Sequence, residues 1–285
     1  MNLKLLLRTA SHHVTWFLGT HFPDAIPLVL VTGYPKSGTT WACQLVADYL
    51  QLPFPRFSLL PVGCPAAVQG HELVRKRYRR GVYVLRDGRD VLVSQYFFMA
   101  RSIPEGDRPR LTARQRRNFP GLVNKANVRD NIAAFVNRQM TKPESSPVNW
   151  GNHVRSYFEG NNPNIALLRY EDLLGDSGSI LAEAMSRLTG ESPDSDRAAD
   201  SMRRFSFQRQ AGRSPGQEDR SSFLRKGQAG DWRNQLTLEA AEIFDRYCGD
   251  MLVAAGYEPD HSWVEGCKPS GGVTPATLSP AGEQP

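Results

Sequence analysis

The chain has 285 residues, of which 40% are hydrophobic and 22% are charged, so it can form one sizeable core of about 250 residues. Its four cysteines are scattered without C-x-x-C spacing, which argues against a zinc site and a disulfide framework and makes a reducing cytoplasm the default compartment. The formal net charge of +6 comes with many more arginines than lysines, a ratio that favours planar, bidentate recognition of anions.

Residues 1–25 are predicted to form a helical lead-in. Arg8 and the pair His12-His13 interrupt the apolar run long before a membrane-spanning length, and no signal-peptide cleavage pattern follows. Apolar stripes on helices are more often core than membrane contacts, so we predict core packing for this one and keep peripheral membrane contact as the alternative. The stripe consists of Leu3, Leu6, Leu7, Val14, Trp16 and Phe17.

The stretch Thr32–Trp41 follows a short apolar run, 28–31, and precedes a helical pattern, which is the strand, tight loop and helix of a phosphate-binding loop. Lys36 and the hydroxyls of Ser37, Thr39 and Thr40 add to the inward N–H groups and the helix N-terminus to complete an anion site. In nucleotide triphosphatases the lysine follows the second glycine, whereas Lys36 precedes Ser37-Gly38, and no acidic Mg²⁺ partner is evident downstream.

The next strand signal is 81–85, where apolar residues end in Arg86 and the spacing then turns helical through Ser94. Arg86 is therefore expected at the carboxyl end of a strand, and Ser94 one to two turns into the following helix. A guanidinium and a hydroxyl placed in this way can contact one phosphate from two sides.

Basic residues cluster at 75–80 and again from 101 to 117. Neither cluster is interleaved with aromatic residues in a nucleic-acid-binding motif, so we predict solvated surfaces that also attract a multiply charged ligand, and no nucleic-acid partner. The segment 101–118 has little periodicity and is a candidate lid or acceptor-binding loop.

The C-terminal half adds another strand, 165–169, followed by Tyr170, and a glycine-rich stretch, 223–234. The alternation of apolar runs with helical patterns predicts an α/β fold: a single domain over 26–260 with a mainly parallel central sheet flanked by helices and a P-loop-like strand-loop-helix. Residues 261–285 are predicted to be a disordered tail, because Pro, Gly, Ser and Thr dominate its later part.

Three motifs together resemble the sulfotransferases that use PAPS (3'-phosphoadenosine 5'-phosphosulfate), over roughly residues 26–256. Tyr34–Trp41 is similar to their 5'-phosphosulfate-binding loop, Arg86 and Ser94 to their 3'-phosphate ligands, and Arg225–Trp232 to their Arg-Lys-Gly-x-x-Gly-Asp-Trp signature. Weaker similarities lie at Trp150–Val154 and Tyr170–Asp172.

The resemblance implies PAPS as the sulfuryl donor, PAP as the product and no metal. It implies that aromatic side chains contact the adenine, although ordinary core packing is the alternative for each of them and an equal one for Phe207. By matching position, the nucleotide-binding residues are Lys36, Ser37, Gly38, Thr39, Thr40, Trp41, Arg86, Ser94, Tyr170, Phe207, Arg225, Lys226 and Gly227.

For the catalytic base, the family has a histidine in a Lys-x-His element between the phosphate loop and the Arg86 strand. His71 matches it, whereas Gln69 stands where the family has lysine. An ordinary imidazole can accept a proton near pH 7. Glu72 is the rival base, since some carbohydrate-directed members use a carboxylate, and surface roles for both residues are the remaining alternative. Lys36 is expected to act in catalysis by neutralising charge on the leaving oxygen.

The implied reaction is in-line transfer of a sulfuryl group to the hydroxyl of a small-molecule, carbohydrate or lipid acceptor in the cytoplasm. The variable loops 53–69 and 101–120 carry no motif that identifies this acceptor, and the sequence leaves a homodimer open. A P-loop-like kinase or nucleotide hydrolase using ATP-Mg²⁺ is the alternative function, and a non-catalytic nucleotide-binding protein is a third.

Overall fold

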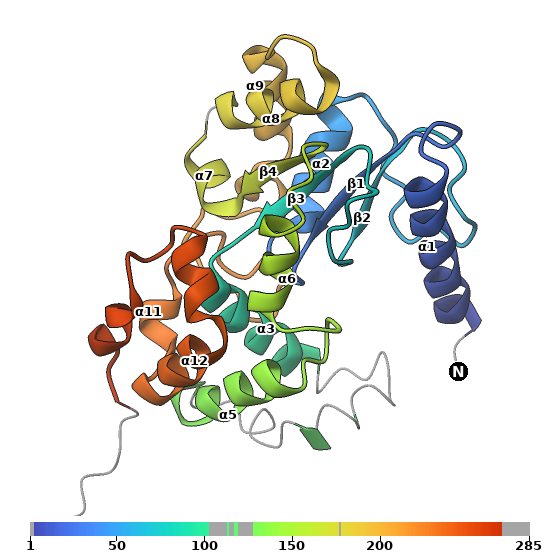
Figure 1. Cartoon of the computed structure of the whole chain (residues 1–285). Coiled ribbons are helices and arrows are strands. Elements are labelled where there is room, and N and C mark those ends of the chain that lie inside the picture. Colours follow the sequence, from blue (N-terminus) through green and yellow to red (C-terminus); the bar gives the residue numbers. More distant parts are fainter. Residues whose placement is uncertain (1–2, 103–112, 114–116, 119–127, 177, 270–285) are drawn as a thin grey trace, which may run out of the picture.

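The computed structural model describes residues 3–102, 113, 117–118, 128–176 and 178–269. Most of the candidate lid, 101–118, and the last part of the predicted tail lie outside the described residues. Figure 1 shows a central sheet with helices on both faces.

Four parallel strands form the sheet in the order β2-β1-β3-β4. A parallel sheet is covered on both faces, which explains why these strands are almost continuous apolar runs in the sequence. All four carboxyl ends lie at one edge of the sheet. The strands are β1 (Leu28–Gly33), β2 (Ala66–Gly70), β3 (Gly81–Leu85) and β4 (Ile165–Arg169).

Successive strand residues belong to two separate hydrophobic cores, as the pleat requires. Leu30 and Tyr83 belong to one core, and their neighbours Val31 and Val82 belong to the other. The first core includes residues of α3 (Gly88–Ser102), α5 (Val128–Thr141), α6 (Trp150–Phe158) and α12 (Leu238–Ala254). The second includes residues of α2 (Thr39–Tyr49), α7 (Tyr170–Gly175), α8 (Ser179–Thr189) and α9 (Ser195–Arg204).

Short helices follow in the C-terminal third. They are α10 (Phe207–Ala211), α11 (Trp232–Gln235) and the 3-10 helix η2 (His261–Gly266). Helix η2 lies inside the stretch predicted to be a tail, and its Trp263 contacts the rings of Trp232 and Phe244 edge-on. The packed chain therefore extends past the boundary predicted at residue 261.

Helix α1 (Leu3–His21) stands at the side of the molecule where β1 and β2 lie (Figure 1). Of its predicted core stripe, Trp16 alone is buried, and it donates a hydrogen bond to the hydroxyl of Tyr78. The prediction of core packing is wrong for the other five, because α1 contacts the molecule with a different face. Exposed are Leu3, Leu6, Leu7, Val14 and Phe17. No helix among the described residues is long and apolar enough to cross a membrane.

Candidate active site

The predicted site residues follow the carboxyl ends of the four strands. The loop 34–38 follows β1, His71 follows β2, Arg86 follows β3 and Tyr170 follows β4. In the sheet, β2 lies on one side of β1 and β3 lies on the other. Ligands of open parallel sheets bind at the carboxyl ends of the strands where the order diverges in this way, which here is between β1 and β3. The topology thus gathers residues separated by more than a hundred positions in the sequence.

The loop after β1 has the backbone of an anion-binding turn. Lys36 and Gly38 both have positive φ, 77° and 89°, and the N–H of Ser37 donates to the carbonyl of Tyr34 at 3.0 Å. A Cβ on Gly38 would lie 2.7 Å from the ring of Tyr170, so only glycine fits there. The buried hydroxyl of Ser37 has no hydrogen-bond partner among the described residues.

Arg86 joins this loop to the C-terminal part of the chain. Its guanidinium donates to the carbonyls of Lys36 (3.1 Å) and Gln228 (3.4 Å) and lies 4.3 Å from the ring centroid of Tyr170. Its buried Nε has no partner among the described residues. A buried cation whose acceptors in the described part of the chain are two carbonyls retains the capacity to bind an anion.

The ammonium group of Lys36 lies between two aromatic rings, 4.5 Å from the centroid of Phe98 on α3 and 4.1 Å from that of Phe223. Burial, followed by the nearby positive charges of Arg86, Arg101 and Arg225, together lower the pKa of Lys36 to about 7. Concentrated positive charge around a lysine of this kind favours a multiply charged anion.

The side chain of His71 is held by a hydrogen bond of 2.8 Å between its Nδ1 and the carbonyl of Gly33. A carbonyl accepts only from N–H, so in the neutral ring the proton is on Nδ1 and Nε2 keeps its lone pair. Burial lowers the pKa of His71, which keeps the ring neutral. Within the described part of the chain, Nε2 has no hydrogen-bond partner.

The carboxylate of Glu72, the rival base, is engaged on both oxygens. One oxygen lies 2.8 Å from Nε2 of His12 on α1, and the other accepts the backbone N–H of His71 at 2.8 Å. The hydrogen bond to His12 lowers the pKa of Glu72 despite its burial. Glu72 thus positions the backbone of His71, and a carboxylate of lowered pKa is a weaker base.

Gln69 contacts the phosphate-binding loop directly. Its Oε1 accepts from the hydroxyl of Thr40 at 2.9 Å, and its Nε2 donates to the hydroxyl of Thr39 at 3.4 Å. The sequence indicated only that Gln69 departs from the family's lysine. Its location on the strand next to the loop was the available signal, because parallel neighbours end at the same edge.

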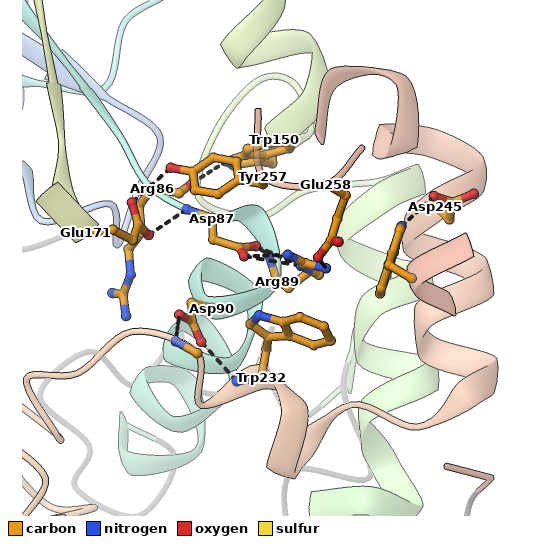
Figure 2. A network of polar contacts seen from close by, with 12 residues as sticks. Arg86, Asp87, Arg89, Asp90, Trp150, Glu171, Trp232, Asp245, Tyr257 and Glu258 are labelled. Carbon is orange, nitrogen blue, oxygen red and sulfur yellow. Dashed lines mark hydrogen bonds and ion pairs between the residues drawn. The ribbon is translucent and has the colours of Figure 1, made fainter. Parts of the chain in front are cut away.

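The glycine-rich stretch after α10 lies next to Arg86 and α3. Asp231 binds both Arg225 and Lys226, each at 2.6 Å. Asp90 on α3 accepts the backbone N–H groups of Gly230 (2.6 Å) and Trp232 (2.9 Å), as Figure 2 shows. These contacts fix the far end of the stretch to the helix that begins after Arg86.

The three predicted adenine-contacting aromatics occupy one region. The ring of Trp41 meets that of Tyr170 edge-on at 5.7 Å, and its Nε1 donates to the carbonyl of Phe205. Phe207 is half-buried and belongs to neither hydrophobic core, which disfavours ordinary core packing. A Cβ on Gly227 would lie 2.4 Å from the Phe207 ring, so the predicted loop glycine packs on this aromatic.

Ser94 lies on α3 and is partly exposed, with no hydrogen-bond partner within the described part of the chain.

Neither of the two acidic residues that follow Arg86 is free to bind a metal ion. Asp87 binds Arg89 at 2.7 Å, and Asp90 holds the backbone at Gly230 and Trp232. The described residues contain no group of three or more His, Cys, Asp or Glu side chains that could hold a metal ion.

Comparison with known proteins identifies the family. The family model described as "Sulfotransferase domain" matches residues 71–256, more than half of the chain. The chain belongs to the sulfotransferase domain family. The match begins at His71, so the phosphate-binding loop at 34–38 lies outside it, towards the N-terminus.

Two curated relatives match most of the length of this sulfotransferase. "Cytosolic sulfotransferase 1" of Danio rerio is 27% identical over 261 residues, covering 76% of this chain and 80% of the relative. "Amine sulfotransferase" of Oryctolagus cuniculus is 25% identical over 262 residues, with 76% and 78% covered.

Solved structures show the same fold. Mouse sulfotransferase SULT7A1 complexed with PAP superposes with a TM-score of 0.57 at 20% identity, covering 83% of this chain and 87% of that chain. Retinol dehydratase in complex with androsterone and PAP gives a TM-score of 0.54 at 18% identity, with 84% and 85% covered. The prediction of an α/β fold with a parallel sheet and a P-loop-like loop is confirmed.

Proposed function

We propose that this sulfotransferase transfers the sulfuryl group of PAPS to an acceptor hydroxyl and releases PAP. The observation that carries the proposal is the anion site between β1 and β3. There the buried Ser37 hydroxyl and the Nε of Arg86 have no hydrogen-bond partner among the described residues, and Lys36 lies among further cations. Buried donors left unpaired in this way fit a bound phosphosulfate nucleotide.

Each group of residues has a distinct role in the proposal. The loop 34–40 and Lys36 bind the 5' side of the nucleotide, and Arg86, Ser94, Arg225, Lys226 and Gly227 bind the 3'-phosphate. Trp41, Tyr170 and Phe207 contact the adenine. Bound PAPS supplies the activated sulfuryl group.

His71 removes the proton of the acceptor through Nε2, because its Nδ1 is bound to the Gly33 carbonyl and its lowered pKa keeps it neutral. Lys36, as a cation, offsets the charge that grows on the leaving oxygen. Glu72 and Gln69 are positioning residues, the first for the His71 backbone and the second for the loop hydroxyls.

The acceptor is proposed to be an alcohol or phenol of small-molecule, carbohydrate or lipid type. Relatives are named for amine and hydroxysteroid acceptors, so a screen of PAPS turnover should include phenols, steroids, sugars, lipid-linked glycans and amines. One relative is named cytosolic, and we propose the same compartment here.

Thermal shift with PAP in the presence of EDTA tests the proposal. We expect PAP alone to raise Tm, and ATP with Mg²⁺ to raise it less. Stabilisation by ATP-Mg²⁺ and none by PAP would favour the kinase or hydrolase alternative. That alternative is disfavoured because Asp87 is bound to Arg89 and Asp90 to backbone N–H groups, so neither is free to bind Mg²⁺.

The assignment of the 3'-phosphate has a sharper test. Arg86→Ala and Ser94→Ala should each weaken PAP binding by roughly 1.5–3 kcal/mol, because each removes a charge-assisted contact. Adenosine 5'-phosphosulfate lacks the 3'-phosphate and is the matched control. An equal loss of affinity for both nucleotides would contradict the assignment.

A further inference from the structure

Helix α1 is oriented with its apolar side outward. The residues in contact with the rest of the molecule are mostly small or polar: Ser11, Thr15, Trp16, Gly19 and Thr20. The opposite side consists of Leu3, Leu6, Leu7, Ala10, Val14 and Phe17, all exposed, with Leu3 at 68% and Phe17 at 52%. A helix at the surface of a water-soluble domain normally has the reverse arrangement.

A second exposed apolar segment lies beside α1. Phe57 and Leu60 are 60% and 74% exposed, and Leu59 is also exposed. The guanidinium of Arg8 on α1 lies 5.2 Å from the ring of Phe57, and the backbone N–H of Val62 donates to the Thr15 hydroxyl at 2.9 Å. We call the outward side of α1 together with 57–60 the α1 face. Exposed apolar side chains on neighbouring segments, as here, are typical of an interaction site.

Positive charge borders the α1 face. The segments 3–28 and 52–80 contain eight lysines and arginines but only two acidic residues, Asp24 and Glu72, and Glu72 is paired with His12. A cavity of about 250 Å³ opens next to Phe17, lined among others by His13, His21, Arg75 and Arg77. Its arginines are exposed and could bind a phosphate group.

We propose that the α1 face binds the surface of an anionic phospholipid bilayer. The apolar side chains of α1 enter the boundary between headgroups and acyl chains, and the bordering cations contact lipid phosphates. The charge pattern favours this partner over a second copy of the chain. Symmetric pairing of two α1 faces would place Lys4, Arg8 and the arginines at 75–77 near like charges with few acidic residues to offset them.

Flotation of the full chain with vesicles tests this inference independently of sulfuryl transfer. We expect binding to phosphatidylcholine vesicles that contain phosphatidylglycerol, weaker binding to phosphatidylcholine alone, and loss of binding as salt is raised. The double variant Leu6→Glu/Phe17→Glu should lower the partition coefficient by about a hundredfold or more, since it removes two large apolar side chains from the buried side. Arg75→Ala/Arg77→Ala should reduce binding to the anionic vesicles and leave binding to phosphatidylcholine unchanged.

Matched controls are Leu174→Glu on α7 and Tyr247→Glu on α12, two exposed apolar residues. Both helices lie on the other side of the molecule from α1 (Figure 1). Both variants should bind vesicles like the unaltered chain, and circular dichroism melting shows whether each variant is folded. Absence of binding by the unaltered chain, or equal binding by Leu6→Glu/Phe17→Glu, overturns the proposal. A lipid-free dimer in light scattering that Phe17→Glu converts to a monomer overturns it in favour of a second copy.

Discussion

The imidazole of His71 is oriented by the backbone of the neighbouring strand, since its Nδ1 is hydrogen-bonded to the last residue of β1. The backbone carbonyl of His71 in turn accepts a hydrogen bond of 3.2 Å from Nε2 of His153. His153 is buried, and burial lowers its pKa to about 4. His153 therefore stays neutral and adds no charge to the site at neutral pH. This arrangement makes Nε2 of His71 the group that can accept a proton.

Substitution of His71 by alanine is expected to lower the turnover number by about 10²–10⁴-fold, the usual contribution of a general base, with PAP affinity near normal. Because burial lowers the pKa of His71, the midpoint of the acid limb in the pH profile of kcat/KM should lie at a pH below the ordinary pKa of an imidazole. Steady-state kinetics over a pH series measures both.

Glu72→Gln is the control for His71. It keeps the shape of the side chain and the acceptor for the His71 backbone, so turnover should fall far less. If Glu72→Gln abolishes turnover and His71→Ala does not, the carboxylate is the base and a carbohydrate acceptor becomes the better assignment.

Lys36 predicts a proton linkage. Its pKa in the free protein is about 7, so it is largely neutral at pH 8, whereas a bound anion favours the ammonium form and raises the pKa. PAP binding at pH 8 should therefore take up protons, and the affinity should fall as pH rises through 7. Calorimetry in two buffers of different ionisation enthalpy measures the uptake.

Lys36→Met should abolish this uptake, and it should lower the turnover number more than it weakens PAP binding. Lys36→Arg should be a poor replacement, because a planar fork does not substitute for a point charge. No proton uptake by the unaltered protein at pH 8 would refute the assigned pKa.

At the scale of elements, the segment 212–230 contains four glycines with positive φ, and some of them are in tight contact with a side chain. Gly227 and Gly212 have nearly the same φ, 63° and 68°. A Cβ at Gly227 would meet the Phe207 ring, whereas one at Gly212 would meet nothing within 4 Å. The two glycines therefore separate the effect of backbone strain from the effect of contact.

Gly212→Ala should cost about 1 kcal/mol of stability from backbone strain alone, with PAP affinity unchanged. Gly227→Ala should cost more and should also weaken PAP binding, because the ring of Phe207 or the loop must move. Chemical denaturation and PAP titration of the two variants provide the comparison. Equal effects on PAP affinity would show that the contact with Phe207 does not matter for the nucleotide.

At the scale of the whole molecule, buried charges join the start of α3 to the segment after α12 (Figure 2). Arg89, almost completely buried, binds Asp87 at 2.7 Å and Glu258 at 2.5 Å, and its guanidinium lies 3.7 Å from the ring centroid of Trp232. Glu171 accepts the N–H of Asp87 and the hydroxyl of Tyr257, which links α7 to the same network. The site residue Arg86 precedes Asp87 directly in the chain and therefore adjoins this network.

Arg89→Leu is expected to lower the free energy of unfolding by about 3–5 kcal/mol, because it leaves the buried carboxylate of Asp87 and the partly buried one of Glu258 without their partner. Arg203→Leu removes the exposed partner of Asp200 on α9 and should change the free energy of unfolding by about 0.5 kcal/mol or less. Urea denaturation of both variants checks the difference. A similar loss in both would mean that the Arg89 network does not support the fold.

The sequence by itself determined the local units: the strand and loop at 28–41 with a helix after them, the strand ending at Arg86, and the phosphate-binding character of Lys36–Thr40. Such units are readable because glycine positions, apolar periodicity and capping depend on neighbouring residues. The parallel α/β class also followed from alternation along the chain.

Only the tertiary structure decided which distant groups meet. The pairing of Glu72 with His12, the contact of Gln69 with Thr39 and Thr40, and the aromatic rings around Lys36 all depend on register and strand order. The same holds for α1, whose helical pattern was readable but whose outward face was not. A hydrophobic pattern shows which residues lie on the same side of a helix. Which side is buried depends on the surface that the rest of the fold presents to the helix.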